Sequence, residues 1–242
     1  GVARVAYAAA DPNPLAAGGG DVLRGRRVAV AHLGVEPWPL REWLFRQRTG
    51  RPMVTLKLAA TVDGRIAAPD GTSQWITGPA ARERAHRERA QLDAIVVGTG
   101  TVVADDPALT ARRPDGTLYP HQPLRVVLGT RDLPAGSKLA GAVHVRSHDP
   151  GDVLAAVGDA LHVQVEGGPT VAGAFVAAGL VDRVQAYIAP VLLGAGRSAL
   201  EIESVGTLAD ALRMRLESVE RVGDDVLLTL SRGEDAGGRP RA

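Results

Sequence analysis

The chain has 242 residues, of which 45% are hydrophobic and 23% are charged, and its formal net charge is +1. This length suits one large domain, alone or with a small appendage, and the near-neutral charge excludes a global field that recruits nucleic acid or an anionic membrane. The absence of cysteine excludes disulfides, a thiol nucleophile and cysteine-ligated zinc. No apolar run reaches the roughly 18 residues of a membrane span and no signal-peptide pattern opens the chain, so we expect a cytoplasmic protein without a membrane partner.

The first fifty residues predict two short strands and a helix. The strands are expected over 2–9 and 27–33, and the segment DPNPLAAGGG between them has the Pro, Asn and Gly content of a loop. A helix is expected over 36–48, because prolines stand at its start and Gly50 follows its end. This region is too small to hold a core of its own.

Lysine 57 stands in the middle of an apolar strand. The strand is expected over 54–60, where Thr55, Lys57 and Ala59 share one face. The only other lysine is Lys138, since nearly all basic residues are arginine. Lysine and arginine differ in their capacity to give up a proton, so a lysine at this place suggests chemistry. The alternative is a surface lysine whose stem lies along the strand.

Two charged features follow the strand. Asp63 precedes Gly64 in a turn, so it is either a turn-forming residue or a catalytic carboxylate. A helix is expected over 79–91, and Arg82, His86 and Arg89 fall on one face of it. A charged helix face is most often only solvated, and a binding role is the alternative.

The rest of the chain alternates strands with helices. Short strands are expected over 94–97, 125–128, 142–145, 161–165 and 184–189, with helices over 152–160 and 170–178. This alternation predicts an α/β fold, with a mixed, mostly parallel central sheet and helices on both faces. Residues 213–221 and 226–231 predict a C-terminal antiparallel hairpin, and 233–242 has the composition of a disordered tail.

Two glycine turns end strands in this region. Gly98-Thr99-Gly100 lacks the third glycine of a dinucleotide fingerprint, because Val103 stands in its place. Glu166-Gly167-Gly168 precedes a proline that opens a helix, and such a helix N-terminus offers free N–H groups to an anion. Two such turns can line one crevice that holds an anionic cofactor. The alternative is an ordinary tight turn without a ligand.

Metal ligation is not expected. His144 and His148 are four residues apart, but no third ligand is placed near them.

Four ordered motifs carry a family resemblance. They are TLKLAATVDGRIA at 55–67, SQWITG at 73–78, VGTGTVVADDPALTAR at 97–112 and VEGGPTVAGAFVAAGLVDRVQAYIAPVLLGAG at 165–196. Over residues 50–232 the chain resembles the reductase domain of the bifunctional riboflavin-biosynthesis deaminase/reductase. The resemblance implies a dihydrofolate-reductase-like three-layer fold, usually in a homodimer. It also implies NADPH-dependent reduction of the phosphorylated substrate 5-amino-6-(5-phosphoribosylamino)uracil to its ribitylamino product.

The resemblance also implies which residues form the site. It places NADPH at Ala59, Trp75, Thr101, Asp105, Thr130, Gly168, Pro169, Thr170, Val171, Ala172, Gly173 and Ala174. It places the substrate at Ser73, Arg89, Leu109, Arg112 and Glu166. Lys57 and Asp63 lie in the motif beside the reacting centre. We assign Lys57, Glu166 and Asp63 as catalytic candidates and the two arginines as ligands of the substrate phosphate, since a guanidinium suits a phosphate. The proton donor stays open between Lys57, Asp63 and water.

The N-terminal region departs from the family pattern. Residues 1–49 resemble the end of the deaminase domain plus a linker helix, but the His-x-Glu and Pro-Cys-x-x-Cys motifs of that zinc domain are absent from this chain. The chain starts at Gly1, which is either a natural start or a truncation. Two alternative functions therefore stay open: a reductase of a related pyrimidine or pterin in a secondary pathway, and a catalytically silent nucleotide-binding partner.

Overall fold

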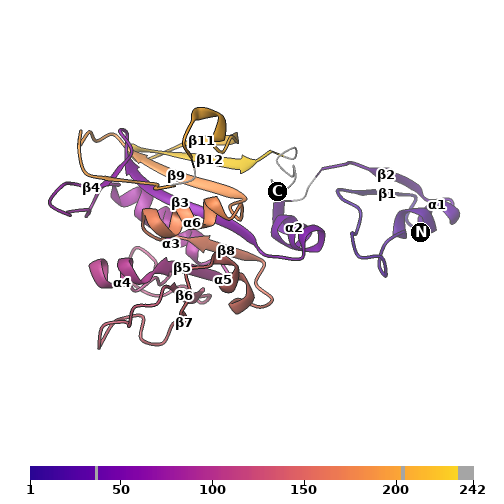
Figure 1. Ribbon diagram of the computed structural model, residues 1–242. Helices are drawn as coiled ribbons and strands as arrows, with labels where there is room; N and C mark the ends of the chain where they lie inside the picture. Colours follow the sequence, from indigo (N-terminus) through magenta and orange to yellow (C-terminus); the bar gives the residue numbers. More distant parts are fainter. Residues whose placement is uncertain (36–37, 203–204, 234–242) are drawn as a thin grey trace. The chain divides into compact units, whose positions relative to one another are not determined.

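The computed structural model describes residues 1–35, 38–202 and 205–233 (Figure 1). The chain divides into two compact units, Gly1–Met53 and Val54–Ala242. Most of the segment expected to be a disordered tail lies outside the described residues. Within the described ranges, no helix combines the length and apolarity needed to cross a membrane.

The N-terminal unit holds a parallel pair of strands, β1 (Arg4–Tyr7) and β2 (Ala29–His32). The rings of Tyr7 and His32 stack at its end, 4.8 Å apart. Both strands were expected, but α1 (Gly19–Gly25) begins inside the segment assigned to a loop. Its glycines lower helix propensity, so the sequence pattern hid it. A 3₁₀ turn, η1 (Trp38–Leu40), leads into α2 (Arg41–Thr49), which ends at Gly50 in the left-handed conformation.

The second unit is built on an eight-stranded sheet of order β11-β12-β9-β3-β8-β5-β6-β7. Its strands are β3 (Met53–Thr61), β5 (Ala94–Gly98), β6 (Leu124–Leu128), β7 (Val143–Val145), β8 (His162–Val165), β9 (Arg183–Ala189), β11 (Met214–Val222) and β12 (Asp225–Arg232). The pairs β3–β9, β5–β6, β5–β8 and β6–β7 are parallel, and the β11–β12 hairpin joins β9 antiparallel. The expected α/β sheet with a C-terminal hairpin is confirmed.

Helices cover both faces of this sheet (Figure 1). They are α3 (Pro79–Arg89), α4 (Thr99–Asp105), α5 (Pro150–Ala156) and α6 (Pro169–Ala177). The sequence pattern indicated only a glycine turn where α4 begins. It also predicted a longer α5, which instead ends before Gly158, a residue in the left-handed conformation. Smaller elements are the antiparallel pair β4 (Arg65–Ala67) and β10 (Arg197–Ser198), and the 3₁₀ turn η2 (Leu208–Asp210).

The two faces of the sheet bury different side chains. On one face, Val54, Leu56 and Val165 pack with Phe175 of α6 and Val153 of α5 in the main apolar core. On the other face α4 covers the apolar residues of β5 and β6, while α3 covers β3 and β9. Because successive residues of a strand point to opposite faces, Lys57 lies on the α3 side.

The strand order creates a crevice. The chain passes from β3 to β5, continues outward to β6 and β7, and returns with β8 between β3 and β5. The direction of winding changes at β8, because the next strand, β9, lies on the far side of β3. Ligands of α/β sheets bind at such switch points, outside the carboxyl ends of the strands.

Candidate active site

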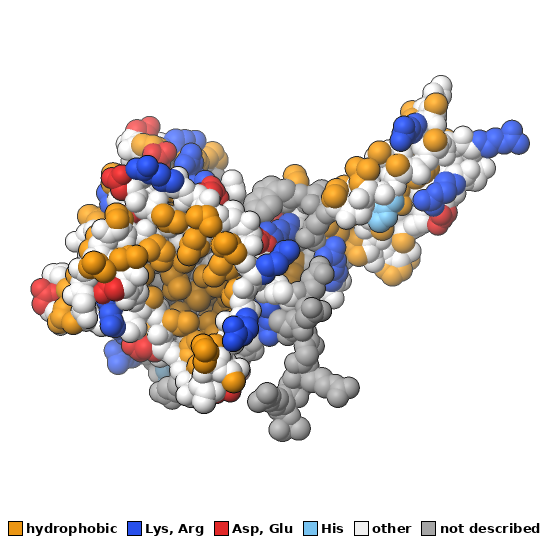
Figure 2. All heavy atoms as spheres, turned by 90° about the horizontal axis from the view of Figure 1, so that it is seen from above, with side chains coloured by type: hydrophobic (Ala, Val, Ile, Leu, Met, Phe, Trp, Pro, Cys, Tyr) orange, Lys and Arg blue, Asp and Glu red, His pale blue; other side chains and the backbone are white. Residues whose placement is uncertain are grey.

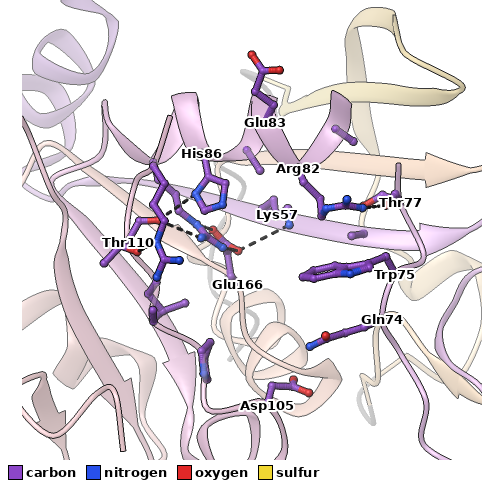
Figure 3. Close-up of a pocket in the computed structure, with 18 of the residues that line it drawn as sticks. Lys57, Gln74, Trp75, Thr77, Arg82, Glu83, His86, Asp105, Thr110 and Glu166 are labelled. Atoms are coloured by element: carbon purple, nitrogen blue, oxygen red, sulfur yellow. Dashed lines mark hydrogen bonds and ion pairs between the residues drawn. The ribbon is translucent and has the colours of Figure 1, made fainter. Parts of the chain in front are cut away.

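A cavity of about 810 Å³ opens at this switch point (Figure 3). Its walls come from β3, the end of β8, α3 and the loop after α4. The structure brings together in these walls most of the residues assigned from the sequence, namely Lys57, Ala59, Ser73, Trp75, Arg89, Thr101, Asp105, Leu109, Arg112 and Glu166. Their positions in the chain are far apart, so the fold gathers them into one site.

Glu166 is the buried anion of this site. Its carboxylate accepts two hydrogen bonds from Arg89, Nε to Oε1 at 2.9 Å and Nη2 to Oε2 at 2.8 Å. Gln164 donates a third at 2.8 Å, and the ammonium of Lys57 lies 3.7 Å from Oε2. Burial raises the pKa of Glu166, but Arg89 and Lys57 outweigh it and hold this pKa well below its usual range. Glu166 is therefore a fixed acceptor rather than a proton donor at neutral pH.

Lys57 lies between this carboxylate and an aromatic ring. Its side chain is 16% exposed, and its Nζ lies 5.7 Å from the centre of the Tyr187 ring. The Tyr187 hydroxyl donates a 2.6 Å hydrogen bond to Glu88 of α3, which also accepts from Arg84 and Gln185. Burial, then Glu88, raises the pKa of Tyr187. The ring is thus held as a neutral wall beside the ammonium.

Glu88 and Tyr187 were missed by the sequence analysis. The available signal was in β9, where Gln185 and Tyr187 alternate with apolar residues and so form a polar face inside a central strand. A buried polar face needs partners, and α3 supplies them.

Arg89 and Arg112 both donate hydrogen bonds to Thr110. Arg89 uses Nη1 to donate to the carbonyl of Thr110 at 3.4 Å, in addition to its two bonds with Glu166. Arg112 is exposed and donates from Nε to the Thr110 hydroxyl at 2.8 Å. The guanidinium of Arg112 therefore keeps most of its donors available to a ligand, whereas Arg89 keeps fewer.

Trp75 forms an exposed wall of the cavity. Trp75 is 69% exposed, and the guanidinium of Arg82 lies 4.5 Å from the centre of its ring. Arg82 also donates to the carbonyl of Thr77 at 2.8 Å. This cation–π contact fixes the indole as a flat apolar surface, a suitable stacking partner for a heteroaromatic ring.

The two glycine turns do lie side by side, because β5 and β8 are neighbours. The backbone N–H of Gly168 donates to Thr101 Oγ1 at 3.2 Å, which joins the two turns. A methyl group placed on Gly98 or Gly167 would come within 2.6 Å or 2.7 Å of the Val171 side chain, so close approach requires glycine there. No side-chain hydrogen bond caps α4 or α6 within the described residues. Apart from the Gly168 N–H, which is bonded to Thr101, and Pro169, which has no N–H, the N–H groups at the start of these helices are therefore available to an anion.

Nine of the assigned residues, Asp63, Thr130 and the segment 168–174, are not among those that line the cavity. Asp63 accepts hydrogen bonds from the N–H groups of Leu193 and Gly194 and from Thr61, and these bonds, Thr61 first, lower its pKa to about 2. This geometry is that of a loop-fixing residue. Thr130 contacts His148 at 3.4 Å at the ends of β6 and β7. The segment 168–174 forms the start of α6.

The described residues contain no group of three metal-ligating side chains. His144, which is four residues from His148, instead contacts the carbonyl of Gly129 at 2.8 Å.

The sheet and its crevice at the switch point define an α/β domain with a ligand-binding crevice. Residues 52–228 match the family model described as the RibD C-terminal domain, and the chain belongs to this family. The expected function, a pyrimidine reductase of riboflavin biosynthesis, is confirmed at the level of this family.

Curated relatives and solved structures agree with the family match. The chain is 52% identical over 237 residues to riboflavin biosynthesis protein RibD of Mycobacterium tuberculosis, covering 95% of this chain and 70% of the relative. It is 44% identical to the protein of the same name from Corynebacterium ammoniagenes, covering 87% of this chain and 65% of that one. The structure of Acinetobacter baumannii RibD, form 1, matches with a TM-score of 0.81 at 30% identity, covering 96% of this chain and 74% of that chain.

Proposed function

We propose that this chain reduces the ribosyl group of 5-amino-6-(5-phosphoribosylamino)uracil to the ribitylamino group, with NADPH as the reductant. The observation that carries the proposal is the buried cluster of Lys57, Glu166 and Arg89 at the base of the cavity. A fixed ammonium and a fixed carboxylate beside one another are suited to holding a sugar by its hydroxyl and ring oxygens while its C1 is reduced.

Each side chain has a task in this scheme. Glu166 accepts hydrogen bonds from ribose hydroxyls and so positions the reacting carbon. Lys57 donates to the substrate oxygen and supplies the proton, because its neighbours orient Nζ, whereas Asp63 is committed to the 193–194 loop. Arg112 binds the 5-phosphate of the substrate. The Ser73 hydroxyl and the remaining N–H groups of Arg89 donate further hydrogen bonds to this phosphate.

The chain offers a suitable place for NADPH. The N–H groups at the start of α6 and α4 suit its pyrophosphate, and Gly98, Gly167 and Gly168 allow its close approach. Ala59 is small and shares the strand face of Lys57, which leaves room for a nicotinamide beside the ammonium. When bound, NADPH supplies the hydride. Trp75, Thr101, Asp105, Thr130 and the segment 168–174 complete the proposed cofactor site.

The proposed domain arrangement follows the two compact units. Residues 50–232 form the reductase domain, and 1–49 correspond to the end of a deaminase domain with a linker helix. The division of the chain at Met53 supports this boundary. A biosynthetic enzyme acting on small phosphorylated molecules belongs in the cytoplasm, which we propose as its location.

A partly exposed apolar face of the sheet, on β11, β12 and β9, supports a homodimer. On the side opposite to Leu227, the pairs Leu216–Leu230, Val219–Leu228 and Ile188–Val226 run across β11, β12 and β9. Leu216 and Val219 are 54% and 59% exposed. Figure 2 shows hydrophobic side chains gathered in a hollow on the face seen from above. Exposed apolar patches of this kind mark interfaces, and a second copy of this chain is the proposed partner.

The dimer is tested by analytical ultracentrifugation of wild type and of the double variant Leu216→Asp, Val219→Asp. We expect a wild-type dimer and a monomeric variant. A monomeric wild type would overturn the proposed dimer.

The function is tested by substrate-dependent oxidation of NADPH, followed at 340 nm. Freshly made 5-amino-6-(5-phosphoribosylamino)uracil is compared with its phosphate-free analogue and with NADH as the reductant. We expect efficient turnover only with the phosphorylated substrate and NADPH. Equal efficiency with the phosphate-free analogue would favour a related pyrimidine or pterin, and tight NADPH binding without turnover would favour a silent partner.

A further inference from the structure

Thr110 gathers three basic side chains at the rim of the cavity. Its carbonyl lies 3.0 Å from Nδ1 of His86 and accepts from Nη1 of Arg89, while its hydroxyl accepts from Arg112 at 2.8 Å. All four residues line the cavity, and Figure 3 shows the His86 ring on the α3 side, facing Thr110. His86 and Arg89 come from α3, whereas Thr110 and Arg112 come from the loop after α4.

The contact with Thr110 decides the tautomer of His86. A carbonyl oxygen only accepts hydrogen bonds, so Nδ1 carries a proton and donates it. In the neutral ring, Nε2 is then an acceptor without a hydrogen. Within the described part of the chain, no backbone or side-chain atom makes a hydrogen bond with Nε2. The atom is therefore available to a ligand in the cavity, but it can donate to an anion only after the ring gains a second proton.

The charges around His86 keep the ring neutral in the ligand-free protein. Burial lowers the pKa of His86, and the positive charges of Arg89 and Arg112 lower it further, against the opposing effects of the Thr110 carbonyl and Glu166. Arg82 and Glu83 of the same helix also line the cavity. A phosphate dianion held by Arg89 and Arg112 reverses this balance, because it brings two negative charges to the same place.

We infer that His86 is an additional ligand of the substrate phosphate, and that its imidazole takes up a proton from solvent when the phosphate binds. The inference rests on the proposed function, in which Arg112 and Arg89 bind that phosphate. It gives a task to His86, which the family resemblance assigned to neither substrate nor cofactor. Proton uptake adds a charge-assisted hydrogen bond from Nε2 and links phosphate affinity to pH.

The first test follows the His86 ring directly by NMR. The six histidines of ¹⁵N-labelled wild-type protein are titrated with and without D-ribose 5-phosphate, with D-ribose as the control. The spectrum of His86→Asn identifies the His86 signals. We expect ribose 5-phosphate, and not ribose, to raise the pKa of His86 by about one unit or more. Binding of ribose 5-phosphate without this shift would overturn the inference and leave the proposed function standing.

Absence of ribose 5-phosphate binding would overturn the phosphate site as a whole. The proposed function fails by a separate result, the absence of NADPH turnover with the full substrate. The two failures are therefore distinguishable.

The second test uses variants with different donors. Asn in place of His86 retains an N–H group for the Thr110 carbonyl but has nothing at the position of Nε2, while His86→Gln reaches toward that position without a charge. For His86→Asn we expect the KM of the phosphorylated substrate to rise about tenfold with little change in kcat. His86→Gln recovers part of this loss.

The pH dependence separates phosphate binding from a merely structural role. Between about pH 7 and 8.5 the substrate phosphate is already a dianion, so a wild-type KM that rises with pH in this window reports loss of the His86 proton. In His86→Asn we expect a KM that does not vary over this window. A His86→Asn enzyme with the wild-type KM and pH profile would overturn the inference.

Discussion

The two faces of the central sheet differ in what they bury. Under α5 and α6 the face is wholly apolar, with Val54, Leu56 and Phe175 at most 1% exposed. Under α3 the same strands present Lys57, Glu166 and their partners, and α3 itself contributes charged residues to the contact. The apolar face supplies stability by removing hydrocarbon from water, whereas the polar face holds buried charges whose net contribution to stability is small.

This difference between the two faces shows which of them carries the chemistry. Buried charges persist on the α3 side because each has fixed partners: Glu166 has Arg89, Gln164 and Lys57. Such a network is rigid before substrate arrives, so little reorganisation is needed during reaction. The apolar face under α5 and α6 therefore mainly stabilises the fold, and the polar face under α3 carries the chemistry.

The largest expected effect is on turnover. Replacement Lys57→Met removes the proposed proton donor from the polar face, and we expect kcat to fall about 10²- to 10³-fold with little change in the KM of NADPH. The control is Arg87→Met, because Arg87 is an exposed basic residue of α3 that is not among the residues lining the cavity. Near-normal turnover of the Lys57 variant, measured at 340 nm, would remove Lys57 from the mechanism.

The second expected effect is on stability. Glu166→Gln leaves the buried charges of Arg89 and Lys57 without their anion, so we expect the free energy of unfolding to fall by about 3 kcal/mol in urea denaturation. The control is Asp224→Asn, whose ion pair with Arg221 is 79% and 89% exposed and contributes little. Equal effects of the two substitutions would contradict the contrast between buried and exposed pairs.

A third effect belongs to the apolar face. A methyl group on Gly173 of α6 would lie 1.8 Å from the Glu201 carbonyl oxygen, whereas one on Gly168 would meet its nearest atom, Thr101 Oγ1, at 3.7 Å. We expect Gly173→Ala to lower the free energy of unfolding by about 2 kcal/mol, because backbone must shift, and Gly168→Ala to leave it nearly unchanged. Thermal denaturation of the pair measures this difference, and it would be contradicted by a Gly173→Ala protein as stable as wild type.

The smallest expected effect is on how stability varies with pH under acidic conditions. The pKa of Asp63 lies at about 2, below its ordinary 3.8, because Thr61, Gly194 and Leu193 donate to the carboxylate. A depressed folded-state pKa adds stability that is present above about pH 4 and is lost as pH falls toward 2. Urea midpoints measured over this range are expected to fall less steeply for Asp63→Asn than for wild type. Parallel slopes would show that the carboxylate is not held in this way.

The fold was largely predictable from the sequence, because apolar periodicity and glycine or proline boundaries are local signals. The helices that were missed, α1 and α4, have seven residues each and are rich in glycine or β-branched residues, so that tertiary packing overrides weak propensity. Likewise, motifs identified ten of the wall residues of the cavity as candidates, although they missed Tyr187.

The pairings inside the site were not predictable. Arg89 and Glu166 are separated by 77 positions, and Tyr187 and Glu88 by 99, so no spacing rule brings them together. The sequence therefore suggested both arginines as equivalent phosphate ligands. In the structure, two nitrogen atoms of Arg89 donate hydrogen bonds to Glu166, whereas Arg112 donates to the Thr110 hydroxyl instead. The strand order, which returns β8 beside β3, places Glu166 next to Lys57 and within reach of Arg89 on α3.

The most direct measurement follows the hydride into the product. NADPH carrying deuterium at both C4 positions is incubated with the protein and 5-amino-6-(5-phosphoribosylamino)uracil, and the product is analysed by mass spectrometry. We expect a ribitylamino product one mass unit heavier than that formed with ordinary NADPH, with the deuterium at C1 of the ribityl chain. A product without deuterium, or no product although cofactor and substrate both bind, would contradict the assignment of this crevice to ribosyl reduction.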